Sequence, residues 1–157
     1  MNITLIAVGK TRIPFVLNGI EEYRGRLSRY TPFEIVEIPD IRTTKSMSSD
    51  QQKVMEGEQI LSRLQPSDFV ILLDERGRQF SSMEFAAYIE KLQVSGRKRA
   101  VFVVGGPYGF SPAVYGRGDA KLSLSKMTFN HEMIRMFFAE QIYRAMTILR
   151  HEPYHHE

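Results

Sequence analysis

The chain contains no cysteine among its 157 residues. It therefore forms no disulfide and offers no thiolate to a metal, which excludes a disulfide scaffold and a thiolate zinc site. No apolar run approaches the ~20 residues of a membrane-spanning helix. The opening MNITLIAVGK has too short an apolar run for a signal peptide, and no basic region precedes it. We therefore expect a cytoplasmic protein that makes no membrane contact.

Composition places the chain among ordinary globular proteins. Apolar residues make up 43% of it and charged residues 25%, and residues 1–157 are enough for one domain with a real core. The net charge is +3 and the isoelectric point is about 9.2. This mildly basic balance permits a nucleic-acid partner without requiring one, since a basic solvated surface gives the same balance.

Strand and helix patterns alternate along the chain. Strands are predicted at 2–8, 33–38, 69–73, 100–106 and 122–125, and helices at 13–30, 49–64, 81–94 and 130–150. The runs FVILL and AVFVV are apolar throughout, as in strands buried on both faces. We therefore expect an α/β domain with a mainly parallel sheet covered on both faces. Ligands bind beyond the carboxyl ends of such strands, so the candidate ligand loops are 74–77, 105–110 and 125–128.

Two motifs allow more than one interpretation. VGGPYGF at 104–110 is neither a dinucleotide-binding fingerprint nor a P-loop, so it is either a tight turn or a ligand loop. The C-terminal RHEPYHHE contains three histidines, but Pro153 breaks the helical spacing that a zinc-binding pair needs. A polar tail is favoured over a metal site, and a tail that folds over a site is the third interpretation.

The stretch LSLSKMTFNHEMIRMFFAEQIYRA, residues 122–145, joins a strand pattern to an amphipathic helix without a glycine or proline between them. His131 and Arg135 are four apart and are expected to share a helix face. Glu140 and Arg144 have the same spacing, which favours an ion pair. Two interpretations stay open: an exposed, ion-paired helix, or a helix start at which His131 and Arg135 face an anionic substrate.

The same stretch, followed by HEPYHHE, closely resembles the RlmH family. These are SPOUT-class methyltransferases that methylate N3 of a pseudouridine in 23S, the large-subunit ribosomal RNA. The resemblance extends to ITLIAVGK, EYRGRL with YTPFEIVEIPD, LDERGRQFSS and FVVGGPYGF. It therefore covers essentially the whole chain, in the family's order.

The resemblance implies an α/β-knot fold with a C-terminal trefoil knot, an exception to the rule that folds are unknotted. It also implies a homodimer that acts on the ribosome with S-adenosylmethionine and without a metal. The positions that match the family's cofactor contacts are Leu73, Gly105, Leu122, Ser123, Leu124, Ser125, Lys126 and Met127. The candidates for the RNA-facing, catalytic site are His131, Arg135, Arg144, Tyr154 and His155. The arginines are expected to position the RNA, with His131 or His155 as proton acceptor.

The chain departs from the family pattern at two positions. Many members have Pro where this chain has Asn130, and Gln where it has Glu132. Asn130 is expected to cap the last helix instead, and Glu132 adds a negative charge beside His131. Three other functions remain as alternatives: a non-catalytic ribosome-binding factor, a SPOUT enzyme acting on transfer RNA, and a small-molecule α/β enzyme.

Overall fold

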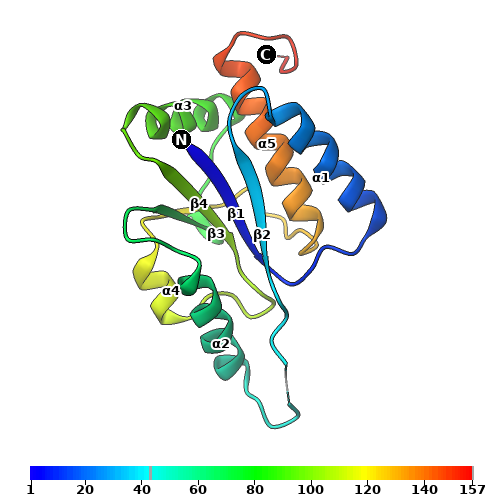
Figure 1. The fold of residues 1–157 in the computed structure, drawn as a ribbon, viewed down its shortest axis with the longest axis vertical. Coiled ribbons are helices and arrows are strands. Elements are labelled where there is room, and N and C mark those ends of the chain that lie inside the picture. Colours follow the sequence, from blue (N-terminus) through cyan, green and yellow to red (C-terminus); the bar gives the residue numbers. More distant parts are fainter. Residues whose placement is uncertain (43, 157) are drawn as a thin grey trace.

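Five parallel strands form one sheet in the order β2-β1-β4-β3-β5 in the computed structural model, which describes residues 1–42 and 44–156 (Figure 1). Residues 43 and 157 lie outside the described part of the chain. The strands are β1 (Asn2–Val8), β2 (Phe33–Ile38), β3 (Phe69–Arg78), β4 (Arg99–Val104) and β5 (Ala120–Leu122). The predicted α/β class with a mainly parallel sheet is confirmed.

Helices cover both faces of this sheet. α1, α3 and α5 lie on one face, and α2 and α4 lie on the other (Figure 1). α5 packs against both α1 and α3. The helices are α1 (Pro14–Leu27), α2 (Ser49–Ser62), α3 (Ser82–Val94), α4 (Pro112–Arg117) and α5 (Met133–Leu149).

The central strands are apolar because each of their faces is buried. In β1, Ile3 and Leu5 belong to the core cluster under α3 and α5, whereas Ile6 belongs to the cluster under α2 and α4. In β4, Phe102 and Val103 divide between the two clusters in the same way. Successive strand side chains point to opposite faces, so a strand covered on both sides has no position for a polar residue facing solvent.

β3 is longer than predicted. The sequence places its end at Leu73, but the strand continues to Arg78, and both of these residues pair with Leu122 of β5. Residues 74–77 therefore form a bulge at the carboxyl end of the strand. A Cβ on Gly77 would lie 2.6 Å from backbone atoms of Leu122, so only glycine permits this close approach.

The predicted strand at 122–125 is wrong in position, because β5 spans Ala120–Leu122. The chain leaves the sheet after Leu122, where the Ser123 N–H donates to the Arg78 carbonyl (3.0 Å). α5 begins at Met133 rather than at residue 130. Asn130 Oδ1 accepts hydrogen bonds from the N–H groups of Glu132 (2.9 Å) and Met133 (3.2 Å) in the turn that leads into α5, although Glu132 rather than Asn130 occupies the N-cap position.

Candidate functional site

A cavity of about 150 Å³ lies at the carboxyl ends of β3 and β5, the edge of a parallel sheet at which ligands bind. Its walls come from the bulge of β3, the segment after β5 and the start of α5. It is lined by Leu73, Asp74, Glu75, Leu122, Ser123, Leu124, Ser125, Lys126, Met127, Thr128, Phe129 and Ile134. Every predicted cofactor residue apart from Gly105 is among them. We call this cavity the loop pocket.

Side chains, rather than glycine or proline, hold the turn that forms the loop pocket. Ser123 Oγ donates to the Ser125 carbonyl (2.9 Å), and the Met127 N–H donates to Ser125 Oγ (3.0 Å). Such hydroxyl-to-backbone bonds stabilise turns. Ser123 is buried, whereas Met127 is 80% exposed. The serines of LSLS therefore build a turn, although their alternation with leucine is typical of a strand.

A second cavity of about 290 Å³ adjoins the loop pocket on the side of α3. Three of its six further lining residues are phenylalanines, and the ring centroids of Phe129 and Phe137 lie 5.3 Å apart. The two cavities share Leu122, Ser123, Leu124 and Phe129. Apolar walls with a few polar groups are the usual lining of a small-molecule site, so the pair offers room for a ligand with a flat apolar part and a polar part.

Asp74 is fixed in the wall of the loop pocket by two hydrogen bonds. The Tyr115 hydroxyl donates to Oδ2 (2.5 Å), and the Arg76 N–H donates to Oδ1 (2.8 Å). Partial burial favours the neutral acid, but these bonds and the Lys121 charge outweigh it and hold the pKa of Asp74 below its usual value. The same bond raises the pKa of Tyr115 to about 12. Asp74 falls within the candidate ligand loop 74–77, but its bond to Tyr115, 41 positions away, leaves no signal in the sequence.

The glycine-rich segment after β4 forms a tight turn. The Gly109 N–H donates to the Gly106 carbonyl (3.1 Å). A Cβ on Gly105 would lie 3.2 Å from the ring of Phe110, which is buried beneath the turn. Gly105 does not line the loop pocket, so its contact with a cofactor stays a prediction.

Arg135 is buried, with 1% of its surface exposed. Its guanidinium donates to the carbonyls of Val8 (2.9 Å) and Gly9 (2.8 Å) and to Thr11 Oγ1 (2.8 Å), and its Nε donates to the His131 carbonyl (3.2 Å). Burial lowers the pKa of Arg135. The side chain therefore ties the end of β1 to the start of α5.

His131 lies in the turn before α5 and is exposed, with its Nε2 3.8 Å from Glu132 Oε2. The expectation that His131 and Arg135 share a helix face is therefore wrong, because α5 begins after His131 and Arg135 is buried, so the two side chains do not jointly face a substrate. Glu132 is itself nearly buried. Its Oε1 accepts from the N–H groups of Ile13 (2.9 Å) and Arg12 (2.6 Å), which hold the pKa of Glu132 below its usual value.

Arg144, Tyr154 and His155 meet beside the C-terminal half of α5. Arg144 Nη1 lies 3.1 Å from His155 Nδ1, and Arg144 Nη2 donates to Glu140 Oε1 (2.6 Å), which confirms the predicted pair. The Tyr154 hydroxyl donates to Glu140 Oε1 (2.9 Å) and lies 3.1 Å from the Tyr23 hydroxyl. Burial and these two bonds raise the pKa of Tyr154.

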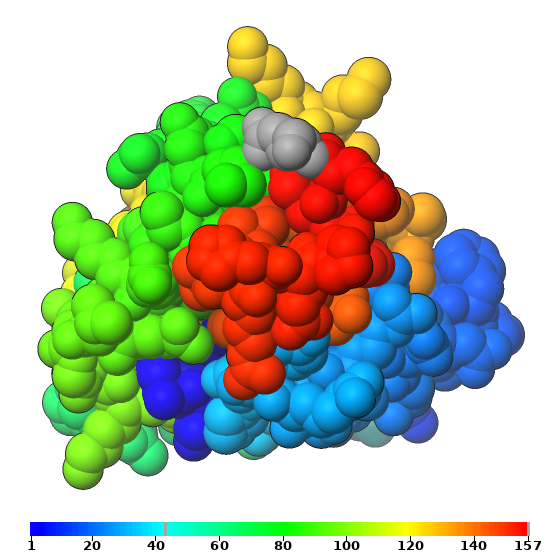
Figure 2. Space-filling view, turned by 90° about the horizontal axis from the view of Figure 1, so that it is seen from above, coloured from blue at the N-terminus to red at the C-terminus, as the bar shows by residue number. Residues whose placement is uncertain are grey.

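The C-terminal segment folds over the end of α5, where Figure 2 shows it in red on the surface. Tyr30 helps to hold it there by donating to Glu152 Oε2 (2.5 Å). The loop pocket lies at the other end of α5, since Ile134 lines it. At about 1.5 Å per residue, Ile134 and Arg144 are separated by roughly 15 Å along the helix. Within one chain, the predicted cofactor residues and the cluster of Arg144, Tyr154 and His155 thus form two separate groups.

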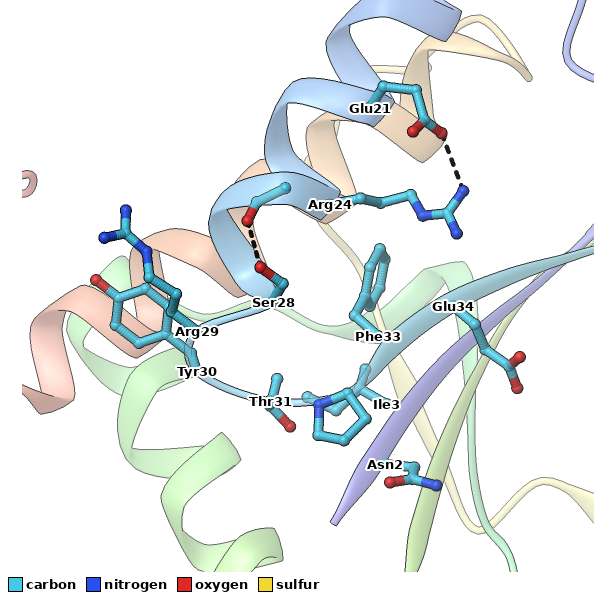
Figure 3. A pocket seen from close by; sticks show the side chains of 12 residues that line it. Asn2, Ile3, Glu21, Arg24, Ser28, Arg29, Tyr30, Thr31, Phe33 and Glu34 are labelled. Atoms are coloured by element: carbon cyan, nitrogen blue, oxygen red, sulfur yellow. Dashed lines mark hydrogen bonds and ion pairs between the residues drawn. The ribbon is translucent and has the colours of Figure 1, made fainter.

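A larger cavity, of about 710 Å³, lies at the opposite end of the sheet, between the starts of β1 and β2 and the end of α1 (Figure 3). Two of its charged groups, Arg24 and Glu21, form an ion pair (3.0 Å). None of the predicted site residues lines it. Because parallel sheets bind ligands at the carboxyl ends of their strands, we assign this cavity no ligand.

The part of the chain that the structure describes comprises residues 1–42 and 44–156. In that part of the chain, no three side chains of His, Asp or Glu are grouped closely enough to hold a metal ion. None of the helices found there is long and apolar enough to cross a membrane.

Comparison with known proteins decides the family. A family model described as predicted SPOUT methyltransferase matches residues 1–155. The chain belongs to the SPOUT methyltransferase family. It is 58% identical over 157 residues to the ribosomal RNA large subunit methyltransferase H of Porphyromonas gingivalis and to that of Parabacteroides distasonis, with 100% of each chain covered. The ribosomal RNA large subunit methyltransferase H of Flavobacterium johnsoniae is 53% identical over 157 residues, again with 100% of each chain covered.

Solved structures support the SPOUT fold. The transfer RNA (m1G37) methyltransferase of Aquifex aeolicus superposes with a TM-score of 0.56 at 11% identity, covering 100% of this chain and 76% of that one. A probable methylase family protein from Haemophilus influenzae gives 0.53 at 13% identity, covering 96% and 66%. The family resemblance and the α/β class predicted from the sequence pattern are both confirmed.

Proposed function

We propose that this SPOUT methyltransferase uses S-adenosylmethionine to methylate N3 of a pseudouridine in 23S ribosomal RNA, acting as a cytoplasmic homodimer on the assembled ribosome. One observation carries the proposal: 58% identity, over the full length of both chains, to relatives named for methylation of large-subunit ribosomal RNA. The transfer RNA enzyme among the structural neighbours is 11% identical, which supports a common fold and nothing about the substrate.

The donor groups of the loop pocket and its neighbour fit S-adenosylmethionine. Leu73, Leu122 and Leu124 offer apolar surface to a flat base, and the segment from Ser123 to Met127 offers backbone and hydroxyl groups. The carboxylate of Asp74 suits a cationic ligand. When bound, S-adenosylmethionine supplies an electrophilic methyl group. In our proposal, Leu73 and residues 122–127 hold it, and the glycine turn at Gly105 lies beside them.

The RNA nitrogen that accepts the methyl group must be activated by the protein before it can attack the methyl carbon. N3 of pseudouridine is an imide nitrogen that must lose its proton, so a base or a nearby cation lowers the barrier. Arg144 supplies the cation, and His155, 3.1 Å from it, accepts the proton. His131, exposed at the start of α5, is the alternative base. Arg135 does not contact the RNA in this proposal, because its guanidinium is hydrogen-bonded to Val8, Gly9 and Thr11. It instead positions the start of α5.

A homodimer brings the two groups of residues together. The loop pocket and the cluster around Arg144 and His155 are roughly 15 Å apart along α5 in one chain, by the helix rise. In a two-fold dimer the same surfaces of both copies meet, so each pocket can receive the cluster of the partner. We also infer the trefoil knot, in which the segment between β5 and α5 is threaded; it fits the family.

The direct test is methyl transfer from labelled S-adenosylmethionine. Assembled ribosomes, isolated large subunits and transfer RNA are offered separately, and the modified nucleoside is identified by mass spectrometry. We expect the label on a pseudouridine of 23S RNA, with assembled ribosomes as the best substrate. Labelling of transfer RNA would identify the alternative enzyme. Cofactor binding without labelling of any RNA would favour a binding factor.

A further inference from the structure

Tyr115 contacts side chains of the β3 bulge, the glycine turn and β5 near the carboxyl edge of the sheet. From the short helix α4, its hydroxyl donates to Asp74 in the bulge of β3. Its ring packs edge-on against Phe110 of the glycine turn, with centroids 5.6 Å apart. Lys121 of β5, whose strand leads into the segment 122–127, places its Nζ 5.1 Å from the ring centroid. Tyr115 and the carboxylate that it holds are thus positioned by side chains from three parts of the chain.

Asp74 differs from the other charged groups that line the loop pocket. Both of its oxygens accept a hydrogen bond, from Tyr115 and from Arg76, and the side chain is half-buried. Glu75 and Lys126 also line the pocket but are exposed. A charge that is already fixed and partly shielded from water acts more strongly on a ligand than a mobile, solvated one. Each carboxylate oxygen keeps a second lone pair for that ligand.

We propose that Asp74, held by Tyr115, is the residue that makes the loop pocket favour a positively charged methyl donor over its neutral product. The proposal rests on the proposed function, because it requires S-adenosylmethionine as the ligand. S-adenosylmethionine carries a sulfonium charge that S-adenosylhomocysteine lacks, whereas the two share the base, the ribose and the amino acid part. A carboxylate near the sulfur therefore distinguishes them, and losing that attraction after transfer assists product release.

The test is calorimetric titration of the full chain with three ligands: S-adenosylmethionine, S-adenosylhomocysteine and sinefungin, which carries an amine in place of the methylated sulfur. We expect Asp74→Asn to weaken S-adenosylmethionine and sinefungin about tenfold and S-adenosylhomocysteine less than about threefold, as loss of one partly screened charge pair predicts. Tyr115→Phe, which leaves the carboxylate but frees it, shifts the same ratio in the same direction by a smaller factor. Asp74→Glu, which keeps the charge, retains part of the preference.

Glu58→Gln is the matched control, because it removes the same charge from an exposed position on α2; we expect it to change no affinity. Equal losses for donor and product in Asp74→Asn would overturn the proposal, since Asp74 would then bind a part that both ligands share. A selective loss in Glu75→Gln instead would also overturn it. If the unaltered chain bound none of the three ligands, the proposed cofactor itself would be wrong. Should Asp74→Asn fail to fold, Tyr115→Phe decides the question through the same ratio.

Discussion

Glu56 of α2 is a carboxylate buried beneath the glycine turn, with 2% of its surface exposed. Its Oε1 has no hydrogen-bond partner among the described residues. Its Oε2 would overlap a Cβ on Gly106, so the carboxylate and the glycine occupy complementary space. Burial raises the pKa of Glu56; a bond with Gln52 opposes this, and the charge of Asp40 adds to it. The native state therefore holds this proton to a higher pH than the unfolded chain does.

From this it follows that Glu56→Gln stabilises the protein at neutral pH. Because the folded pKa lies above the unfolded one, the native state loses stability as pH rises from the unfolded pKa through the folded pKa, and glutamine has no proton to lose. We expect the free energy of unfolding to rise by about 1 kcal/mol near pH 7.5, the scale of an uncompensated buried polar group, and to change little near pH 4, where glutamate is largely protonated in both states.

Urea unfolding at the two pH values measures this difference. Glu58→Gln, on the exposed side of the same helix, serves as the control and should change stability by less than about 0.5 kcal/mol at either pH. An equal effect of Glu56→Gln at both pH values would show that the charge of Glu56 is not the cause.

At the scale of single residues, the sequence predicted which residues gather around one cavity better than it predicted what surrounds each side chain. Residues 73 and 122–127 were expected at a cofactor site from resemblance, and the structure places them around one cavity. The environment of Arg135 was not predictable, because the atoms that bury it, on Val8, Gly9 and Thr11, are far away in the sequence. The four-residue spacing of His131 and Arg135 predicts that two side chains are neighbours on one helix. It does not show whether another element covers them.

Among the elements, boundaries set by local chemistry were predictable. β1 and β2 have the expected bounds, and the helix predicted from residue 81 begins there with a capping box, in which Ser81 and Glu84 exchange bonds. The element ends that were predicted wrongly depend on pairing between segments distant in the sequence. β3 continues past Leu73 because Arg78 also pairs with Leu122. β5 ends at Leu122, so the rest of the predicted strand, residues 123–125, lies outside the sheet. No local pattern in the sequence records such a pairing.

The start of α5 offers a test at the scale of an element. Asn130→Ala removes the acceptor for two N–H groups that no helical carbonyl reaches. We expect the free energy of unfolding to fall by about 1 kcal/mol, the usual loss for a missing cap. Asn130→Asp keeps the acceptor oxygen and is the matched control. Urea unfolding of both variants checks this, and equal stability of the alanine and aspartate variants would contradict a capping role.

On the scale of the whole molecule, the two groups of candidate residues lie toward opposite ends of α5. The loop pocket surrounds the helix start, and the pairs of Arg144 with His155 and with Glu140 lie in its C-terminal half. The tail that carries His155 is fastened in place by Tyr154 and Tyr30. With the tail held in this way, the proposed homodimer is the arrangement in which the cluster of one chain serves the pocket of the other.

Complementation between two variants tests this arrangement. Leu124→Arg fills the loop pocket with a charged side chain, and Arg144→Ala removes the cation that the proposal assigns to the RNA side. Each variant alone should lose most of its methyl transfer, for different reasons. If the site is shared, coexpression yields heterodimers in which one intact pocket faces one intact cluster, so a substantial part of the activity returns.

Two differently tagged chains allow the heterodimers to be isolated and assayed with labelled S-adenosylmethionine. Cofactor binding is measured for each variant, and Arg144→Ala should retain it because Arg144 does not line the loop pocket. Heterodimers that stay inactive, beside fully active tagged unaltered dimers, would show that each chain uses its own pocket and its own Arg144. That result would require the tail to leave the end of α5 and travel to the pocket of the same chain, against the bonds that now hold it.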